Sequence, residues 1–199
     1  MEINKEEKEM HSIYFEKVSF EEFEKQMRKI SLYEYATKHE IQEIYDKVSL
    51  PRRATKGSAG YDFFAPFDIR LEKGTSIQFP TGIRVHMPKD VALLIYPRSG
   101  LGFKHRIQLD NTVGVIDSDY IHADNEGHIQ AKLTCDSKTS DFVKIEAGKG
   151  FAQGIFTPVL FTKDDNATEQ RTGGLGSTDG KAQKEITTEA LKKKEKKGC

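Results

Sequence analysis

The chain has 199 residues, with 31 Lys and Arg side chains against 31 Asp and Glu, so its formal net charge is zero. This balance argues against stable nucleic-acid binding, and the length fits one domain with extensions. Two cysteines are too few for a disulfide-rich secreted domain. The longest apolar run, residues 91–96, is too short to cross a bilayer. The sequence therefore predicts a cytoplasmic protein that does not bind membranes.

Residues 1–50 are predicted to form a helical N-terminal extension. The stretches that begin at Ser19 and at Thr37 each match the capping-box pattern, with Glu three residues later. Apolar residues then recur at helical spacing, namely Phe20, Phe23, Met27 and Ile30 in the first helix and Ile41, Ile44, Tyr45 and Val48 in the second. We expect these stripes to pack on the main domain or on another copy of the chain.

Residues 51–165 change to a period of two, which is typical of β-strands. The alternating apolar positions are Ile83, Val85 and Met87, and later Ile129, Ala131, Leu133 and Cys135. Gly and Pro interrupt these runs at short intervals. Many short strands without intervening helices predict a mainly β domain, either a sandwich, a jelly roll or a barrel.

The C-terminal part is predicted to contribute little to the core. Residues 166–180 form a Gly-rich arm, and residues 181–199 form a Lys-rich tail with 7 Lys against 3 Glu. A segment of this composition has little apolar surface to bury, so we expect frayed helix or disorder in the tail.

One segment concentrates chemically useful side chains. A strand with Val113 and Val115 is expected to leave a buried layer at Asp117, and Tyr120 follows. An ordinary Asp-rich turn is one interpretation of this pattern. The other is a site, because the Asn111 amide suits a pyrimidine edge, an aromatic ring can pack against a sugar, and a carboxylate can accept a proton from water.

Four further segments are small, polar and rich in Gly. Asp62 stands at the start of a strand, and Arg98-Ser99-Gly100 follows residues 91–96 with groups suited to phosphate oxygens. Gln153 lies in an apolar strand, where it could simply bond the backbone. Residues 171–178 combine an Arg with Gly, Ser and Thr; the alternatives are a flexible linker and an arm that closes over a polyanion.

Together and in this order, the five segments resemble the motifs of the trimeric dUTP diphosphatases (dUTPases), from about residue 53 to residue 178. The resemblance is strongest to the form found in Gram-positive bacteria and their phages, in which the third motif continues as here through residues 124–129. It implies a jelly-roll or distorted β-barrel fold and a homotrimer with active sites shared between chains. The implied reaction is hydrolysis of dUTP to dUMP and pyrophosphate with Mg2+.

The resemblance also implies a role for each matching residue. Asp117 would be the general base, Asn111 would read the uracil edge and Tyr120 would lie beneath the deoxyribose. Asp62 would contact Mg2+ through water, while substrate phosphates hold the ion. The residues expected to bind substrate are Arg98, Ser99, Gly100, Asn111, Val115, Tyr120, Gln153, Arg171, Leu175, Gly176, Ser177 and Thr178.

The sequence departs from the family pattern in three places. Leu175 replaces the usual Phe, which predicts weaker closure of the arm because the stacking ring is absent. Residues 122–125 are extra, and we expect a solvent loop here, not a metal site built from His122, Asp124 and His128. The helical segment and the Lys-rich tail have no counterpart in the minimal enzyme.

Two alternatives remain at this point. A dCTP deaminase shares the fold and much of the phosphate site, although Asn111 and the Asp117 to Tyr120 pattern favour the diphosphatase. A second alternative adds a regulatory role, in which residues 1–48 or the C-terminal tail bind a partner protein.

Overall fold

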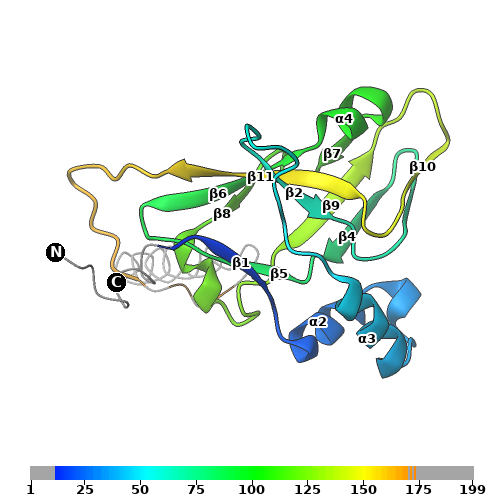
Figure 1. Cartoon of the computed structure of the whole chain (residues 1–199), viewed down its shortest axis with the longest axis horizontal. Coiled ribbons are helices and arrows are strands. Elements are labelled where there is room, and N and C mark those ends of the chain that lie inside the picture. The colour runs from blue at the N-terminus through cyan, green and yellow to red at the C-terminus, as the bar shows by residue number, and fades with distance from the viewer. Residues whose placement is uncertain (1–11, 170, 172, 174–199) are drawn as a thin grey trace, which may run out of the picture.

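The computed structural model describes residues 12–169, 171 and 173, and antiparallel strands dominate it (Figure 1). The central sheet has four strands in the order β2-β11-β6-β8. Its strands are β2 (Tyr61–Phe64), β11 (Gly150–Pro158), β6 (Val91–Pro97) and β8 (Gly114–Ile116). The long β11 and β6 pair over seven positions and form the middle of this sheet.

The remaining strands form a three-stranded sheet and two pairs, all antiparallel. The three-stranded sheet contains β4 (Ser76–Pro80), β9 (Gln130–Cys135) and β7 (Ile107–Leu109), and the pairs are β3 (Ile69–Glu72) with β10 (Phe142–Ile145), and β1 (Tyr14–Lys17) with β5 (Ile83–His86). The predicted alternation is confirmed in β9, where Ala131, Leu133 and Cys135 are buried. The mainly β, jelly-roll-like fold is therefore confirmed.

The expectation that residues 51–165 contain no helix is wrong at two places. Helix α4 (Ser99–His105) follows β6 directly, and a 3-10 helix, η2 (Ser118–His122), follows β8. Arg106 ends α4 in the left-handed conformation, with φ of 50°. The two glycines in α4 concealed this short helix, because Gly lowers helix propensity.

The N-terminal segment contains two α-helices, α2 (Phe20–Met27) and α3 (Lys38–Lys47), with a 3-10 turn, η1 (Ser31–Tyr33), between them. Their core-facing side chains are fully buried, with Phe23, Met27 and Ile41 all 0% exposed. The segment also adds the strand β1, which pairs with β5. It is therefore packed into the domain and is not only a helical appendage, since its side chains belong to the same core cluster as those of the sheets.

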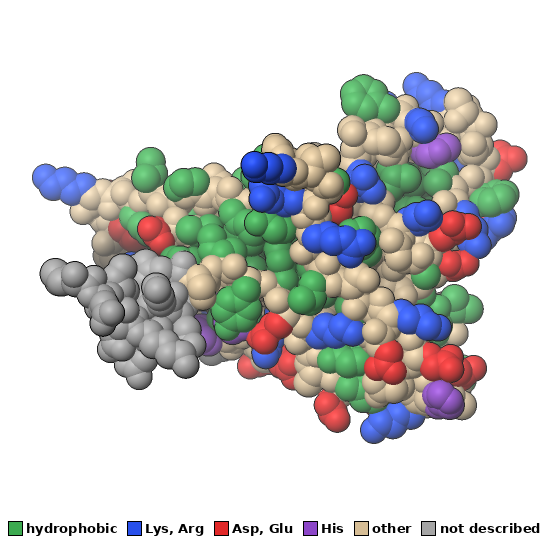
Figure 2. All heavy atoms as spheres, viewed as in Figure 1, with side chains coloured by type: hydrophobic (Ala, Val, Ile, Leu, Met, Phe, Trp, Pro, Cys, Tyr) green, Lys and Arg blue, Asp and Glu red, His purple; other side chains and the backbone are tan. Residues whose placement is uncertain are grey.

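Aromatic rings fix β1 against the central sheet. The Phe15 ring contacts those of Tyr61, Phe63 and Phe156, with centroid separations between 5.6 and 5.7 Å. Figure 2 shows apolar side chains gathered over β1, β6 and β11 on this face, whereas acidic and basic side chains are mixed over α2 and α3. Within the described ranges, no helix has the length and apolarity that a membrane span requires. The tail, residues 181–199, lies outside the described residues.

The two predicted capping boxes have different outcomes. At α3 the box is complete, since Thr37 accepts from the Glu40 amide and the Glu40 carboxylate accepts from the Thr37 amide. At α2 only half of it forms. Ser19 accepts from the Glu22 amide, but the carboxylate that receives the Ser19 amide belongs to Glu126, 107 residues later in the chain.

Candidate active site

A cavity of about 390 Å3 brings together the residues predicted to hold the nucleoside. Asn111, Val115 and Tyr120 line it, together with Arg171 from the chain beyond β11. Apolar side chains such as Phe63, Ile95 and Phe151 form its inner wall. A cavity with apolar walls and a few polar groups is typical of a small-molecule site.

The third motif differs in detail from the expected buried strand. Residues 111–113 form a turn in which Leu109 O accepts from the Thr112 amide, and Thr112 has φ of 63°. Strand β8 therefore starts only at Gly114, and Val115 is 59% exposed. A Cβ on Gly114 would lie 3.3 Å from the Ile95 Cβ, so glycine allows β8 to approach β6 closely.

Asp117 lies at the end of β8, where it forms the N-cap of η2. Its carboxylate Oδ2 accepts from Nη2 of Arg171 at 2.5 Å, and Nε of the same guanidinium donates to Oδ1 of Asp119 at 3.1 Å. The Asp117 side chain remains 49% exposed. About half of the carboxylate side chain is therefore open to solvent while it is paired with Arg171.

The Tyr120 side chain is fixed from behind. Its hydroxyl donates to His128 O at 3.0 Å and accepts from Asn125 Nδ2 at 2.9 Å. The ring is 6% exposed, and the Arg171 guanidinium lies 5.5 Å from its centroid. Burial raises the pKa of the Tyr120 hydroxyl, against the opposing effects of Asn125 and Arg171, so the hydroxyl stays a hydrogen-bond donor.

The expectation of a solvent loop after Tyr120 is only partly correct. His122 and Asp124 are exposed, but Ala123 and His128 are buried. His128 Nε2 accepts from the Gly82 amide at 2.9 Å, so this residue ties the loop to the turn before β5. Among the described residues, no group of three or more His, Cys, Asp or Glu side chains is arranged to hold a metal ion.

The residues predicted to bind phosphate lie elsewhere on the chain. Arg98 follows β6, and Ser99 and Gly100 open α4. Arg98 Nε lies 3.4 Å from Asp62 Oδ1, and its Nη1 donates to Gly150 O at 3.3 Å. Gln153 is opposite Asp62 in the β2–β11 pair, and its side chain donates to Pro97 O at 3.4 Å. Arg98, Ser99, Gly100 and Gln153 are therefore gathered with Asp62 at one end of the central sheet.

Within one chain, the residues predicted to bind the nucleoside and those predicted to bind phosphate line different cavities. The two cavities lined by Arg98 and Ser99 share no lining residue with the cavity that holds Asn111 and Tyr120. Arg171 lies with the nucleoside group. The other predicted arm residues, Leu175, Gly176, Ser177 and Thr178, lie outside the described residues.

Sequence reasoning missed several polar residues around the nucleoside cavity. Asp110 and Lys132 line it and form an ion pair of 2.8 Å between Oδ2 and Nζ. Asp119 belongs to the predicted motif but was given no role, and it shares Arg171 with Asp117. Adjacency to Asn111 was the available signal for Asp110, and nothing in the sequence places Lys132, on another strand, beside it.

Comparison with known proteins shows which family the chain resembles. A family model described as dUTPase matches residues 46–179. The deoxyuridine 5'-triphosphate nucleotidohydrolase of Lactococcus lactis is 38% identical over 153 residues, which cover 75% of this chain and 98% of that protein. The enzyme of the same name from Shewanella halifaxensis is 40% identical over 135 residues, covering 64% and 84%.

Solved structures of dUTPases are also similar to this chain. The dUTPase of Streptococcus mutans superposes with a TM-score of 0.55 at 30% identity, covering 75% of this chain and 98% of that one. A dUTPase mutant from phage phi11 of S. aureus, solved to describe the coordination of a structural Mg(II) ion, gives 0.54 at 17% identity, covering 80% and 98%. The latter likeness shows the shared fold alone.

The β fold and these matches define the chain first as a nucleotide hydrolase. More narrowly, it belongs to the dUTPase family. Relatives from Lactococcus and Streptococcus and phage enzymes with the same fold are among the matches, so the predicted resemblance to the form of Gram-positive bacteria and phages is confirmed.

Proposed function

We propose that the chain hydrolyses dUTP to dUMP and pyrophosphate, with Asp117 as the general base. The observation that carries the proposal is the position of Asp117, half-exposed at the end of the strand whose Val115 lines the nucleoside cavity with Asn111 and Tyr120. The substrate itself follows from the names of the relatives, which are deoxyuridine 5'-triphosphate nucleotidohydrolases.

The reaction needs a nucleophile and charge neutralisation. An Asp carboxylate is ionised at neutral pH, so Asp117 would remove a proton from the water that attacks the α-phosphorus. The bond between the α-phosphorus and the bridging oxygen breaks, and pyrophosphate leaves with that oxygen. Arg98, with Ser99 and Gly100, would bind the phosphates and offset the charge that develops on them.

The nucleoside residues would provide specificity. The Asn111 amide has both donors and an acceptor, which suits the edge of uracil, and Val115 exposes an apolar surface beside it. Tyr120 would pack beneath the deoxyribose and leave no space for a ribose 2'-hydroxyl. The two hydrogen bonds of the Tyr120 hydroxyl support this role. A buried ring held by them cannot shift to make space for a ribose.

The donor groups fit a Mg2+ ion held mainly by substrate phosphates. A cage made only of protein side chains is not formed by the described residues, but Asp62 supplies a carboxylate beside the phosphate-binding Arg98. With the substrate bound, the ion would neutralise phosphate charge, and Asp62 would contact it through water. Gln153, opposite Asp62, completes the polar end of this site.

We further propose a homotrimer in which each active site takes residues from different chains. The support is the separation of the two groups of residues, since the cavity of Tyr120 and the cavities of Arg98 share no residue within one chain.

The arm would complete the site. Arg171 would leave Asp117 when substrate binds and would then contact the β- and γ-phosphates with Ser177 and Thr178. Leu175 would cover the base, and Gly176 beside it would also contact the substrate.

Pyrophosphate release from dUTP, with and without Mg2+, tests the mechanism. We expect Asp117→Asn to lower kcat by at least about a hundredfold, because the general base is lost. Asp119→Asn is the matched control, since Asp119 is equally exposed and shares the partner Arg171. Near-normal activity of Asp117→Asn, or equal losses in both variants, would contradict the assignment. Ammonia release from dCTP in the same assay would indicate the deaminase alternative.

Residues 12–48, the part of the N-terminal segment that the structure describes, give no specific support to a regulatory partner. The apolar stripes that could bind such a partner are buried against the domain's own sheets, as Phe23, Met27 and Ile41 show. The helices of this segment therefore serve to complete the hydrophobic core of the domain.

A further inference from the structure

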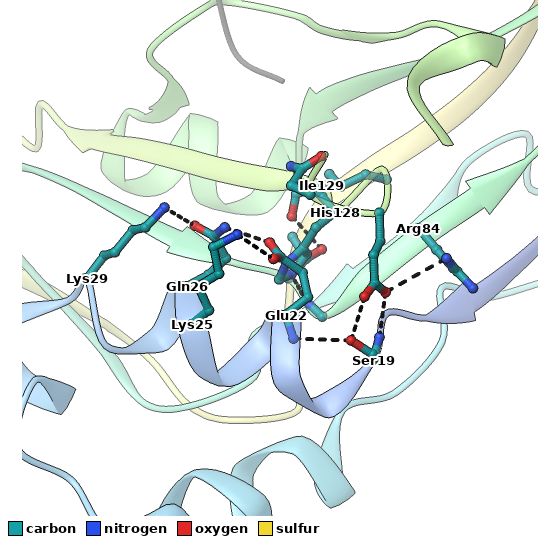
Figure 3. A network of polar contacts seen from close by, with 12 residues as sticks. Ser19, Glu22, Lys25, Gln26, Lys29, Arg84, His128 and Ile129 are labelled. Atoms are coloured by element: carbon teal, nitrogen blue, oxygen red, sulfur yellow. Dashed lines mark hydrogen bonds and ion pairs between the residues drawn. The ribbon is translucent and has the colours of Figure 1, made fainter. Parts of the chain in front are cut away.

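Helix α2 contributes a buried acid that faces the active-site loop. Glu22 is 5% exposed, although it belongs to the first turn of an amphipathic helix where carboxylates normally meet water. Figure 3 shows its side chain turned toward His128 rather than toward Ser19. Glu126 from the loop takes over the capping task, accepting from Ser19 N at 2.8 Å and from Ser19 Oγ at 2.6 Å.

The carboxylate of Glu22 is held by several donors. Gln26 Nε2 donates to Oε1 at 2.6 Å, and Lys25 Nζ lies 3.3 Å from Oε2. Burial alone would raise the pKa of the Glu22 carboxyl, but the neighbouring His128, Gln26 and Lys25 side chains outweigh it and lower the pKa to about 2. The group is therefore ionised at neutral pH inside the protein.

His128 connects this acid to the loop. Its Nε2 accepts from the Gly82 amide, so the ring proton lies on Nδ1. Nδ1 is buried and 3.6 Å from Oε1 of Glu22. Burial lowers the pKa of His128 against the opposing effect of Glu22, so the ring is neutral and presents its N–H to the carboxylate.

The backbone carbonyl group of His128 accepts a hydrogen bond from the Tyr120 hydroxyl. Tyr120 Oη donates to His128 O at 3.0 Å, and Asn125 Nδ2 donates to both oxygen atoms, at 2.9 Å to Oη and 3.1 Å to the carbonyl. The side chain of His128 is thus fixed by α2 and by Gly82, and its backbone fixes Tyr120. A continuous series of contacts leads from the N-terminal helix to the wall of the nucleoside cavity.

From this geometry we infer that Glu22 is a positioning residue for Tyr120, acting through His128. Burying a charged side chain usually gains little stability over an apolar one, so stability alone does not account for the position of Glu22. A fixed orientation is what the sugar site needs, since selection against a 2'-hydroxyl depends on a ring that does not move. The inference rests on the proposed function of Tyr120 and adds Glu22, which lies outside the five motifs, to the determinants of specificity.

The test compares kcat/KM for dUTP with kcat/KM for UTP. In Glu22→Ala we expect the ratio to fall by about tenfold, because the loop that carries His128 loosens and Tyr120 no longer excludes the ribose. Glu22→Gln keeps an acceptor oxygen for His128 and should retain most of the ratio. The matched control is Glu21→Ala, which removes an exposed acid from the same turn of α2 and should leave the ratio unchanged.

A purely structural role would lower the melting temperature of Glu22→Ala and leave the ratio as in wild type, which would overturn the inference. If Glu22→Ala does not fold, Glu22→Asp serves instead, because it keeps the charge but shortens the reach to His128, and the same fall is expected. Binding of dUMP and UMP, measured by calorimetry, gives the same comparison without hydrolysis. Failure of wild type to hydrolyse dUTP would instead contradict the proposed function, so the two failures are distinguishable.

Discussion

Two glutamates at the same position of a capping-box pattern have different roles in the structure. Glu22 and Glu40 each stand three residues after the N-cap of a helix. Glu40 is exposed and completes its capping box, and the hydrogen bonds from Thr37 lower the pKa of its carboxyl. Glu22 is buried instead, because the neighbouring loop supplies Glu126 for the cap and His128 for the carboxylate.

The buried acid predicts a specific response to acid. The pKa of Glu22 is about 2 in the folded chain, against an ordinary value of 4.5. Since the folded pKa is depressed, the stabilisation is fully present above pH 4.5 and is lost as the pH falls toward 2. Between pH 5 and pH 3 the free energy of unfolding of wild type should fall by about 2 kcal/mol more than that of Glu22→Gln.

Denaturant titrations at the two pH values measure this difference. Glu21→Gln is the control, and it should follow wild type. If the Glu22→Gln protein loses as much stability as wild type over this range, the carboxylate is not held in the ionised state.

At the scale of elements, the loop between η2 and β9 decides how the site is supported. The loop reverses through Glu126 and Gly127, which have φ of 59° and 70°. A Cβ on Gly127 would lie 2.7 Å from Ile121 Cα and 2.9 Å from Tyr120 O. The loop therefore packs backbone against backbone on the turn that carries Tyr120, and only glycine permits this contact.

We accordingly expect Gly127→Ala to lower the free energy of unfolding by more than about 2 kcal/mol, since strain in φ and a backbone clash act together. Gly148→Ala is the matched control. Gly148 has φ of 76°, but a methyl group there would meet nothing within 4 Å, so only about 1 kcal/mol should be lost. Equal losses in the two variants, measured by chemical denaturation, would show that the backbone contact with Tyr120 contributes nothing.

At the scale of the whole molecule, the separation of the nucleoside and phosphate groups predicts complementation between chains. Asp117→Asn and Arg98→Ala should each be inactive as pure proteins. When the two are unfolded together and refolded as mixed trimers, about a quarter of the sites would combine an intact Asp117 with an intact Arg98 from different chains. Activity should then return to about that fraction of wild type.

Each variant refolded alone is the control for this experiment and should remain inactive. Mixtures that stay inactive would mean that the two groups act within one chain, and the shared-site proposal would fail. The restored activity depends only on which chain supplies each residue, so it reports directly on the sharing of sites.

The sequence by itself determined the β fold, the two N-terminal helices and the order of the five motifs, because alternation, helical periodicity and turn residues are local signals. It predicted Asn111, Val115 and Tyr120 as neighbours, and all three line one cavity. Only the tertiary structure decided that Glu22 turns inward, that β1 joins the β domain, and that Arg171 reaches Asp117. These contacts join residues far apart in the chain, and their free energy depends on burial and on partners that no local pattern encodes.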